Sequence, residues 1–413
     1  MIDSLLISIS LLIFSLGGYL LWPSRFNVVT HLQVGGSFVS IIVPALILHV
    51  QDDYPQNIVD LYIKIIGWGV VCYLPGLFIG YFLMKGKKTR LSFDTMDSIE
   101  YERKAIKITR ILLFTGICAL IVSYAVMGFI PMFAKDPISA KLFRGPYQAP
   151  YLRVAILYRS AFYILATIMP IACVIWYKYR SWNFFIGVVA ALVLMSISLT
   201  RSGAFGGIVL AFAIIMAVKS RFHFLLMMTL VTGVFVLSSF FYYIVGVRKL
   251  DSDVNVWKVI NAGTPDIDDQ LHFMERFEEN PVWTYGRTIY GGLIPGHNKW
   301  NPSVYTLSIV APSEDINEVG SGGLRLPLPL WGYVSFQWVG VILFSFLTGL
   351  LGGMYLRILK EWFDKFSSLV IKTIAVVIFA SVYGIFIGFS TLNMFFIPPA
   401  IVVLFYMYRF KWK

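Results

Sequence analysis

Long apolar runs, separated by short polar segments, make up most of this chain. A membrane-spanning helix needs about 20 consecutive apolar residues, and the sequence offers eleven runs near that length. Several contain Pro or Gly, which membranes tolerate where neighbouring helices cover the backbone. The predicted fold is therefore an all-α polytopic membrane protein with about eleven transmembrane helices. The predicted spans are 3–22, 33–50, 58–84, 108–130, 160–177, 183–199, 203–218, 224–246, 331–356, 368–389 and 394–408.

The composition supports this class. Hydrophobic residues make up 58% of the 413 residues and charged residues only 14%, whereas soluble domains carry about 25% charged residues. The first apolar run is too long for a signal-peptide core and lacks a cleavage site, so it is predicted as the first span. Cys72, Cys118 and Cys173 lie far apart in apolar runs, without the spacing of a metal site. They are predicted to be small core residues.

Charge sets the predicted orientation. The formal net charge is +12, but much of the positive charge lies in short loops beside spans, as the positive-inside rule predicts. The location of these charged residues thus favours a membrane-embedded protein and argues against nucleic acid as a partner. The segment 85–110 holds eight Lys and Arg residues and is predicted to be cytoplasmic. The resulting topology places the N-terminus outside and the C-terminus inside.

The loop formed by residues 248–330 is much longer than the others. It is predicted to lie outside, and it holds 11 of the 22 acidic residues; loops of this length without a function are uncommon. Within it, Leu271, Met274 and Phe277 have helical spacing and share one face. The chain is therefore expected to consist of spans one to eight (1–247), the large extracytoplasmic loop (248–330) and spans nine to eleven (331–413).

Arginine is concentrated on the side predicted to be outside. Arg201 stands between two apolar runs with almost no loop around it, and a snorkelling helix end is the simplest explanation. However, the positive-inside rule depletes short outer loops of arginine. The guanidinium fork binds phosphate through two parallel hydrogen bonds, so a diphosphate-linked lipid is the predicted ligand and ordinary phospholipid the alternative. The candidate diphosphate-binding residues are Arg159, Arg201, Arg248, Arg287 and Arg325.

Aromatic residues mark a second candidate region, the stretch WTYGRTIYGGLIPGHNKWNPS. Flat rings are suited to stacking on sugar faces. The candidate glycan-binding residues are Trp283, Tyr285, Tyr290 and Trp300.

A general base is predicted in the same loop. His297 is the first candidate, because the reference pKa of histidine lies near neutral; Glu275 and Asp269 are alternatives, although a solvated surface position would explain all three. No nucleotide, dinucleotide or zinc motif is found, so no cofactor is predicted. The short Asp clusters at 51–55, 251–253 and 267–269 leave a divalent cation as a rival interpretation.

The order of these features resembles the Wzy-type oligosaccharide repeat-unit polymerases of bacterial surface polysaccharides. An arginine opens a span in LTRSGAFGGIVLAFAII, and Arg159 precedes the fifth span. The large loop carries GRTIYGGLIPGHNKWNP, in which Asn301 interrupts the usual Trp-Pro pair, and a glycine-rich segment, GGLRLPLPLWGY, enters the next span. The resemblance is concentrated in residues 150–356.

This resemblance implies a GT-C-like, metal-independent glycosyltransferase of the bacterial cytoplasmic (inner) membrane. Such polymerases join undecaprenyl-diphosphate-linked repeat units, as in the O-antigen of lipopolysaccharide, at the outer face of the membrane. Arg159 and Arg201 match family positions, whereas Arg248 is placed by topology alone. The implied partners are the lipid-linked glycan donor and acceptor, membrane lipids and a chain-length-regulating co-polymerase.

Two rival functions stay open. An O-antigen ligase of similar fold would share the arginines and the large loop. A polysaccharide flippase or other transporter would place charges near the bilayer midplane and show repeated halves. Lys64 and Lys372 are the main candidates for buried charge, and the sequence shows no internal repeat.

Overall fold

The protein is all-α throughout the part of the chain that the computed structural model describes. Every element there is a helix, and the only strand-like pairing within it is an isolated bridge between Gly292 and Asn393. This confirms the predicted fold class at its coarsest level. The described residues are 2–37, 54–85, 96–220, 222, 225–227, 229–233, 266–294, 298–312, 323–387 and 391–408.

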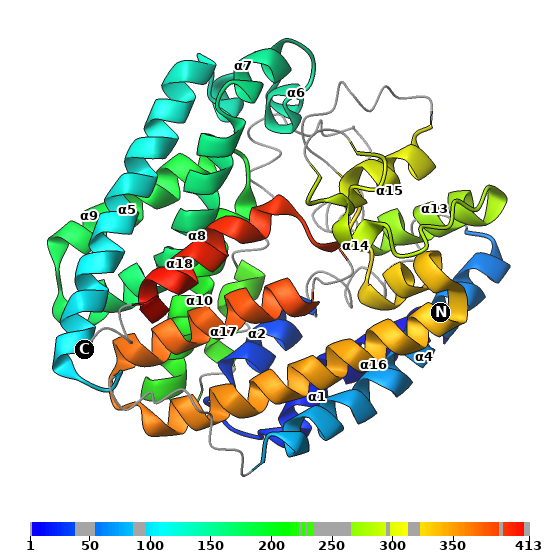
Figure 1. Ribbon diagram of the computed structural model, residues 1–413, viewed down its shortest axis with the longest axis horizontal. Coiled ribbons are helices and arrows are strands. Elements are labelled where there is room, and N and C mark those ends of the chain that lie inside the picture. The colour runs from blue at the N-terminus through cyan, green and yellow to red at the C-terminus, as the bar shows by residue number, and fades with distance from the viewer. Residues whose placement is uncertain are drawn as a thin grey trace. The chain divides into compact units, whose positions relative to one another are not determined.

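Four of the described helices are long and apolar enough to cross a membrane, which suggests a multi-pass membrane protein (Figure 1). They are α4 (Gln56–Leu83), α5 (Ile99–Met127), α8 (Ala155–Tyr179) and α16 (Leu328–Lys365). Other apolar helices are α1 (Ile2–Leu21), α9 (Trp182–Ser196), α10 (Arg201–Lys219), α17 (Leu369–Ile387) and α18 (Ile397–Tyr408), and the short α2 (Val28–Ser37) follows α1.

The number of spans stays a prediction. Nine of the eleven predicted spans lie largely within described helices, whereas most of 33–50 and of 224–246 lies outside the described residues. The length of α9 also differs from that of the predicted membrane span. The 15 residues of α9 rise about 22 Å, which is less than the roughly 30 Å of a hydrocarbon core. Hydrophobicity alone does not reveal where such a helix ends.

The chain forms two compact units, and the predicted large loop belongs to the first. Unit 1 comprises Met1–Lys85, Met228–Arg357 and Ile385–Met394, and unit 2 comprises Gly86–Met227, Ile358–Gly384 and Phe395–Lys413. Each unit has its own buried apolar cluster.

In unit 1, α4 and α16 touch along their backbones. Gly76 and Gly80 of α4 face the α16 backbone, while Gly349 and Gly353 of α16 face the α4 backbone. At each of these four glycines, an added Cβ atom would lie only 1.9–2.3 Å from a carbonyl oxygen of the other helix. Small residues at this spacing allow membrane helices to approach closely. The contacts keep a constant sequence offset, so the two helices run parallel.

The start of α16 reverses direction sharply. Phe336 (φ −143°) and Gln337 (φ 53°) leave helical geometry. A Cβ atom on Gly332 would lie 2.4 Å from the carbonyl oxygen of Gly340, although residues eight apart in a straight helix are about 12 Å apart. The first limb, 328–335, therefore folds back onto the second, at a turn where Gln337 adopts a φ that favours glycine.

The described part of the large loop is folded and packed rather than extended. The predicted apolar face is confirmed: Leu271, Met274 and Phe277 are each no more than 1% exposed. These side chains join a core with residues of α4 and of the first limb of α16. The helices of this segment are α13 (Asp266–Glu279), α14 (Thr288–Gly291) and α15 (Pro302–Val310).

Polar contacts through Gln270 hold α13 in place, and their loss is a testable prediction. The Tyr62 hydroxyl donates to Gln270 Oε1 at 2.5 Å, and Gln270 Nε2 donates to the Arg325 carbonyl at 2.8 Å. Gln270→Ala leaves both partners without this bond, so we expect it to lower the free energy of unfolding by about 1–3 kcal/mol. The thermal unfolding temperature in detergent measures this. Glu279→Gln, at an exposed ion pair with Arg276, is the control, and equal stability of both variants would contradict the prediction.

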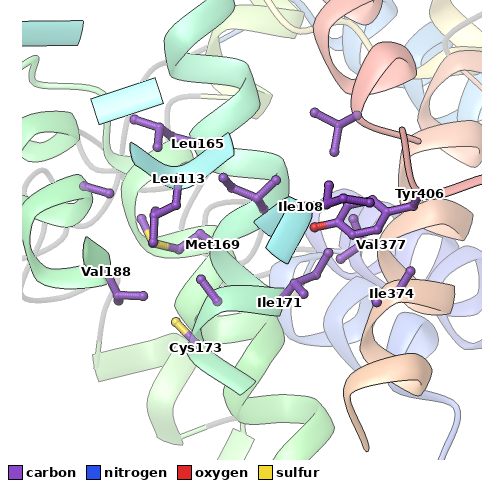
Figure 2. Close-up of a cluster of buried hydrophobic side chains, with 14 of the residues drawn as sticks. Ile108, Leu113, Leu165, Met169, Ile171, Cys173, Val188, Ile374, Val377 and Tyr406 are labelled. Carbon is purple, nitrogen blue, oxygen red and sulfur yellow. The ribbon is translucent and has the colours of Figure 1, made fainter. Parts of the chain in front are cut away.

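In unit 2, α5, α8, α9, α10, α17 and α18 surround one apolar core, part of which is shown in Figure 2. Cys173 lies in this core, as predicted, whereas Cys118 is exposed on the surface of α5, so its prediction as a core residue is wrong. Helical periodicity in an all-apolar segment does not separate a core-facing side from an outward-facing one. Tyr406 is fully buried, and its hydroxyl is 2.7 Å from Thr109 Oγ1.

Two of these helices, α8 and α10, run side by side in the same direction. Gly203 faces the Phe162 ring, and Gly207 faces Met169, at Cβ distances of 2.3 and 2.6 Å. Because the paired positions rise together along both helices, their N-terminal ends lie at the same end of unit 2. This arrangement positions the first candidate site.

The opposite end of unit 2 is fastened by an ion pair. Glu102 of α5 accepts hydrogen bonds at 2.6 Å from both the Lys178 ammonium and the Tyr179 hydroxyl of α8. Glu102 is only 7% exposed, so its charge depends on Lys178 for compensation. This contact fixes α5 and α8 as antiparallel neighbours.

Candidate functional site

Arg159 lies in the second turn of α8 and is held by aromatic residues. Its Nε–H donates to the Tyr151 hydroxyl, and its guanidinium carbon lies 4.4 Å from the centre of the Phe395 ring and 5.5 Å from that of Tyr151. Cation–π contacts of this kind fix a guanidinium group without neutralising it. Arg159 thus remains a positively charged, half-buried and oriented group.

Tyr151 is itself held rigidly. It belongs to α7 (Gln148–Leu152), is 2% exposed and stacks on Phe143 with ring centres 3.8 Å apart. Burial raises the pKa of the Tyr151 phenol, and the neighbouring Arg159 charge only partly opposes this rise. Tyr151 therefore stays neutral at physiological pH and acts as a hydrogen-bonding support for Arg159.

Arg201 is the first residue of α10, directly after Thr200 at the N-cap position. This confirms that an arginine opens the helix. Since Gly203 contacts Phe162, and Phe162 lies one turn after Arg159, the two arginines occupy the same end of unit 2. The first turns of α8 and α10 also bring the positive ends of two helix dipoles to this end. Such an arrangement suits an anion.

A second group of cations lies in unit 1, where α14 meets the turn at 298–301. The Arg287 guanidinium carbon and the Lys299 Nζ atom lie 4.8 and 5.3 Å from the centre of the Trp300 indole. Arg287 and Lys299 are exposed and Trp300 is half-buried. The sequence shows Lys299 as one of the cations of the large loop but assigns it no role.

The four predicted glycan-binding aromatics differ in their surroundings. Trp283 packs edge-on against Phe277, with ring centres 5.0 Å apart, and Trp300 lies beside Tyr305 as well as the two cations. Both rings therefore contribute to packing. Tyr285 and Tyr290 are 65% and 50% exposed, so they offer open ring surface for stacking.

The candidate bases lie on α13 or outside the described residues. Glu275 is half-buried, with a carboxylate oxygen 3.8 Å from His272 Nδ1, and Asp269 is also half-buried. His297 and Arg248 fall outside the described residues. The assignment of a general base therefore stays a prediction.

Two further sequence-based candidates lie in unit 1. Arg325 is exposed, and its carbonyl accepts the hydrogen bond from Gln270. In the Asp cluster at 267–269, Asp268 accepts a hydrogen bond from the Tyr54 hydroxyl. Among the described residues, no three His, Cys, Asp or Glu side chains are grouped as a metal site would require; the cluster at 251–253 lies outside them.

The predicted residues therefore fall into two groups. Arg159 and Arg201 belong to unit 2, whereas Arg287, Arg325 and the four aromatics belong to unit 1. Comparisons of the chain with protein-family models, with curated proteins and with solved structures find no match. The fold and the residues define an all-α protein with several candidate membrane spans.

Proposed function

We propose that this chain is a membrane-embedded glycosyltransferase. It joins oligosaccharide repeat units carried on undecaprenyl diphosphate into a surface polysaccharide, at the outer face of the bacterial cytoplasmic membrane. The observation that carries the proposal is the position of Arg159 and Arg201 in the chain, each near the N-terminus of one of two parallel apolar helices at the same end of unit 2. The order of sequence motifs over residues 150–356 supports the same assignment.

The proposed chemistry needs fixed positive charge. The acceptor hydroxyl oxygen forms a bond to the anomeric carbon of the growing glycan, while the bond from that carbon to the diphosphate oxygen breaks. The electron pair and the developing negative charge go to the leaving undecaprenyl diphosphate. Arg159 and Arg201 stabilise that charge, because preorganised donors are most effective where charge develops in the transition state.

The aromatic support of Arg159 has a role in this proposal. Tyr151 and Phe395 hold the guanidinium group in place before substrate binds. Little reorganisation is then needed as the leaving group departs. Tyr151 and Phe395 act as positioning residues, because they contact Arg159 rather than the reacting atoms.

The acceptor hydroxyl must also lose a proton. We propose His297 as the base, with Glu275 and Asp269 as the next candidates, and the proton passes to that residue as the new bond forms. Arg248 and Arg325 are proposed as further candidate ligands of the lipid diphosphate. The proposed reaction uses no cofactor.

The experiment that tests this function is a polymerisation assay with purified protein in detergent and lipid-diphosphate-linked repeat units from the source organism. We expect a ladder of longer glycans that persists in EDTA. Arg201→Ala removes about 2–4 kcal/mol of transition-state stabilisation, which corresponds to a rate lower by roughly 30- to 1000-fold.

One further variant and one analysis of the product complete the test. Arg201→Lys is expected to restore little activity, because an ammonium group lacks the bidentate fork. Glycan appearing on lipid A core instead of on lipid-linked repeat units would identify a ligase. Absence of any glycan transfer by the native chain would overturn the proposed function.

A further inference from the structure

Two cations in unit 1 share one aromatic ring. The Arg287 guanidinium carbon and Lys299 Nζ both lie within 5.3 Å of the Trp300 ring centre. The Trp300 ring also lies beside Tyr305, 6.3 Å away between ring centres and nearly parallel to it. The indole is thus surrounded by neighbours, and it anchors two positive charges.

The backbone fixes this arrangement. The Asn301 N–H donates to the Asn298 carbonyl at 2.8 Å, so Lys299 and Trp300 are the two central residues of a tight turn. The Asn298 side chain accepts from the Trp300 N–H, also at 2.8 Å. Two cations anchored on one ring both contribute positive potential around it, which favours a bound anion.

The helical turn that carries Arg287 packs directly on this turn. The Gly291 N–H donates to the Arg287 carbonyl at 2.9 Å. A Cβ atom on Gly291 would lie 2.0 Å from the Trp300 carbonyl oxygen, so only glycine permits this approach. Arg287 and Lys299 therefore come from two backbone turns in direct contact.

No carboxylate neutralises these charges within the described residues. Neither Arg287 nor Lys299 forms an ion pair with a carboxylate there, whereas Arg276 on the exposed face of α13 pairs with Glu279 at 3.1 Å. Tyr290, half-exposed, lies one turn after Arg287. Two cations with no carboxylate partner in the part of the chain that the structure describes, together with an exposed aromatic ring, provide complementary contacts for a sugar that carries a negative charge.

We propose that Arg287 and Lys299 bind the carboxylate of an acidic sugar residue in the glycan. The inference rests on the proposed function, because it takes the bound molecule to be a glycan. It narrows the substrate class to repeat units that contain a uronic or similar acidic sugar. It also assigns Arg287 to the glycan rather than to the lipid diphosphate.

The test measures binding of soluble probes to the full-length protein in detergent, by isothermal titration. The probes are a hexamer of galacturonic acid, a hexamer alternating glucuronic acid and N-acetylglucosamine, a neutral galactose hexamer and inorganic pyrophosphate. We expect one or both acidic hexamers to bind more tightly than the neutral hexamer. Arg287→Gln and Lys299→Gln should each weaken that binding by about tenfold, and Arg276→Gln should leave it unchanged.

The outcomes separate this inference from the proposed function. Equal binding of acidic and neutral hexamers, or no effect of the two variants, would overturn the acidic-sugar site. Binding of pyrophosphate that depends on Arg287 and Lys299, without binding of the acidic hexamers, would reassign the site to the lipid diphosphate and overturn it as well. Glycan transfer from lipid-linked repeat units is measured separately, so that activity can persist when the sugar site is disproved.

Discussion

Arg159→Ala is expected to lower the rate of glycan transfer by roughly 30- to 1000-fold, the equivalent of about 2–4 kcal/mol of transition-state stabilisation. The physical reason is that Tyr151 and Phe395 orient this guanidinium group, which is a permanent cation. Its loss removes a fixed cation from the proposed position of the leaving diphosphate. The initial rate of ladder formation at saturating substrate measures the effect.

Conservative and control variants make this prediction specific. Arg159→Lys keeps the charge but loses both the planar fork and the stacking on Phe395, so it should recover little of the rate. Arg180→Ala removes an exposed arginine from the opposite end of α8, where it lies over Tyr177; its rate should be close to that of the native chain. Equal rates for Arg159→Ala and Arg180→Ala, with both folded, would remove Arg159 from the proposed mechanism.

Gly80→Leu is expected to lower the free energy of unfolding of unit 1 by about 3 kcal/mol or more, through severe overpacking. A Cβ atom at Gly80 would lie 1.9 Å from the Leu350 carbonyl oxygen, which belongs to the backbone and cannot rotate away. The α4 and α16 helices must therefore separate. The matching contacts at Gly349 and Gly353 then open as well, so one substitution disrupts the whole helix pair.

Gly67→Leu is the matched control, because it makes the same substitution in the same helix. Nothing lies within 4 Å of a Cβ atom at Gly67, so the leucine should fit without separating the helices. The two variants are compared by thermal unfolding in detergent and by the fraction of protein that stays monodisperse. Equal stability would show that α4 and α16 do not pack through these glycines.

The helices themselves were predictable because long apolar runs leave few alternatives. The buried face of α13 was also predictable, since Leu271, Met274 and Phe277 recur at helical spacing between polar residues. The reversal in α16 was not predictable, because the only polar residues at the turn, Ser335 and Gln337, lie within an otherwise apolar run and carry no turn signal of their own. A turn enforced by tertiary contacts, here between Gly332 and Gly340, leaves no mark in local composition.

Of the residues at the candidate site, only the charged ones could be predicted from the sequence. Arg201 was recognisable because a permanent charge between two apolar runs is rare, and the structure places it at the start of α10. Phe395, which stacks on Arg159, is more than 200 residues away in sequence and is one of many phenylalanines. The packing of Trp283 and Trp300 was not predictable. An aromatic residue that packs against neighbouring rings and one that is exposed for stacking on a sugar look the same in the sequence.

The most direct test of the central claim measures the amount of undecaprenyl diphosphate, the proposed leaving group, that is released. Purified protein in detergent is given lipid-diphosphate-linked repeat units, and the undecaprenyl diphosphate released and the new glycosidic linkages are both quantified by mass spectrometry. The account predicts one undecaprenyl diphosphate released for each linkage formed. Release without glycan elongation, or elongation without release, would contradict it.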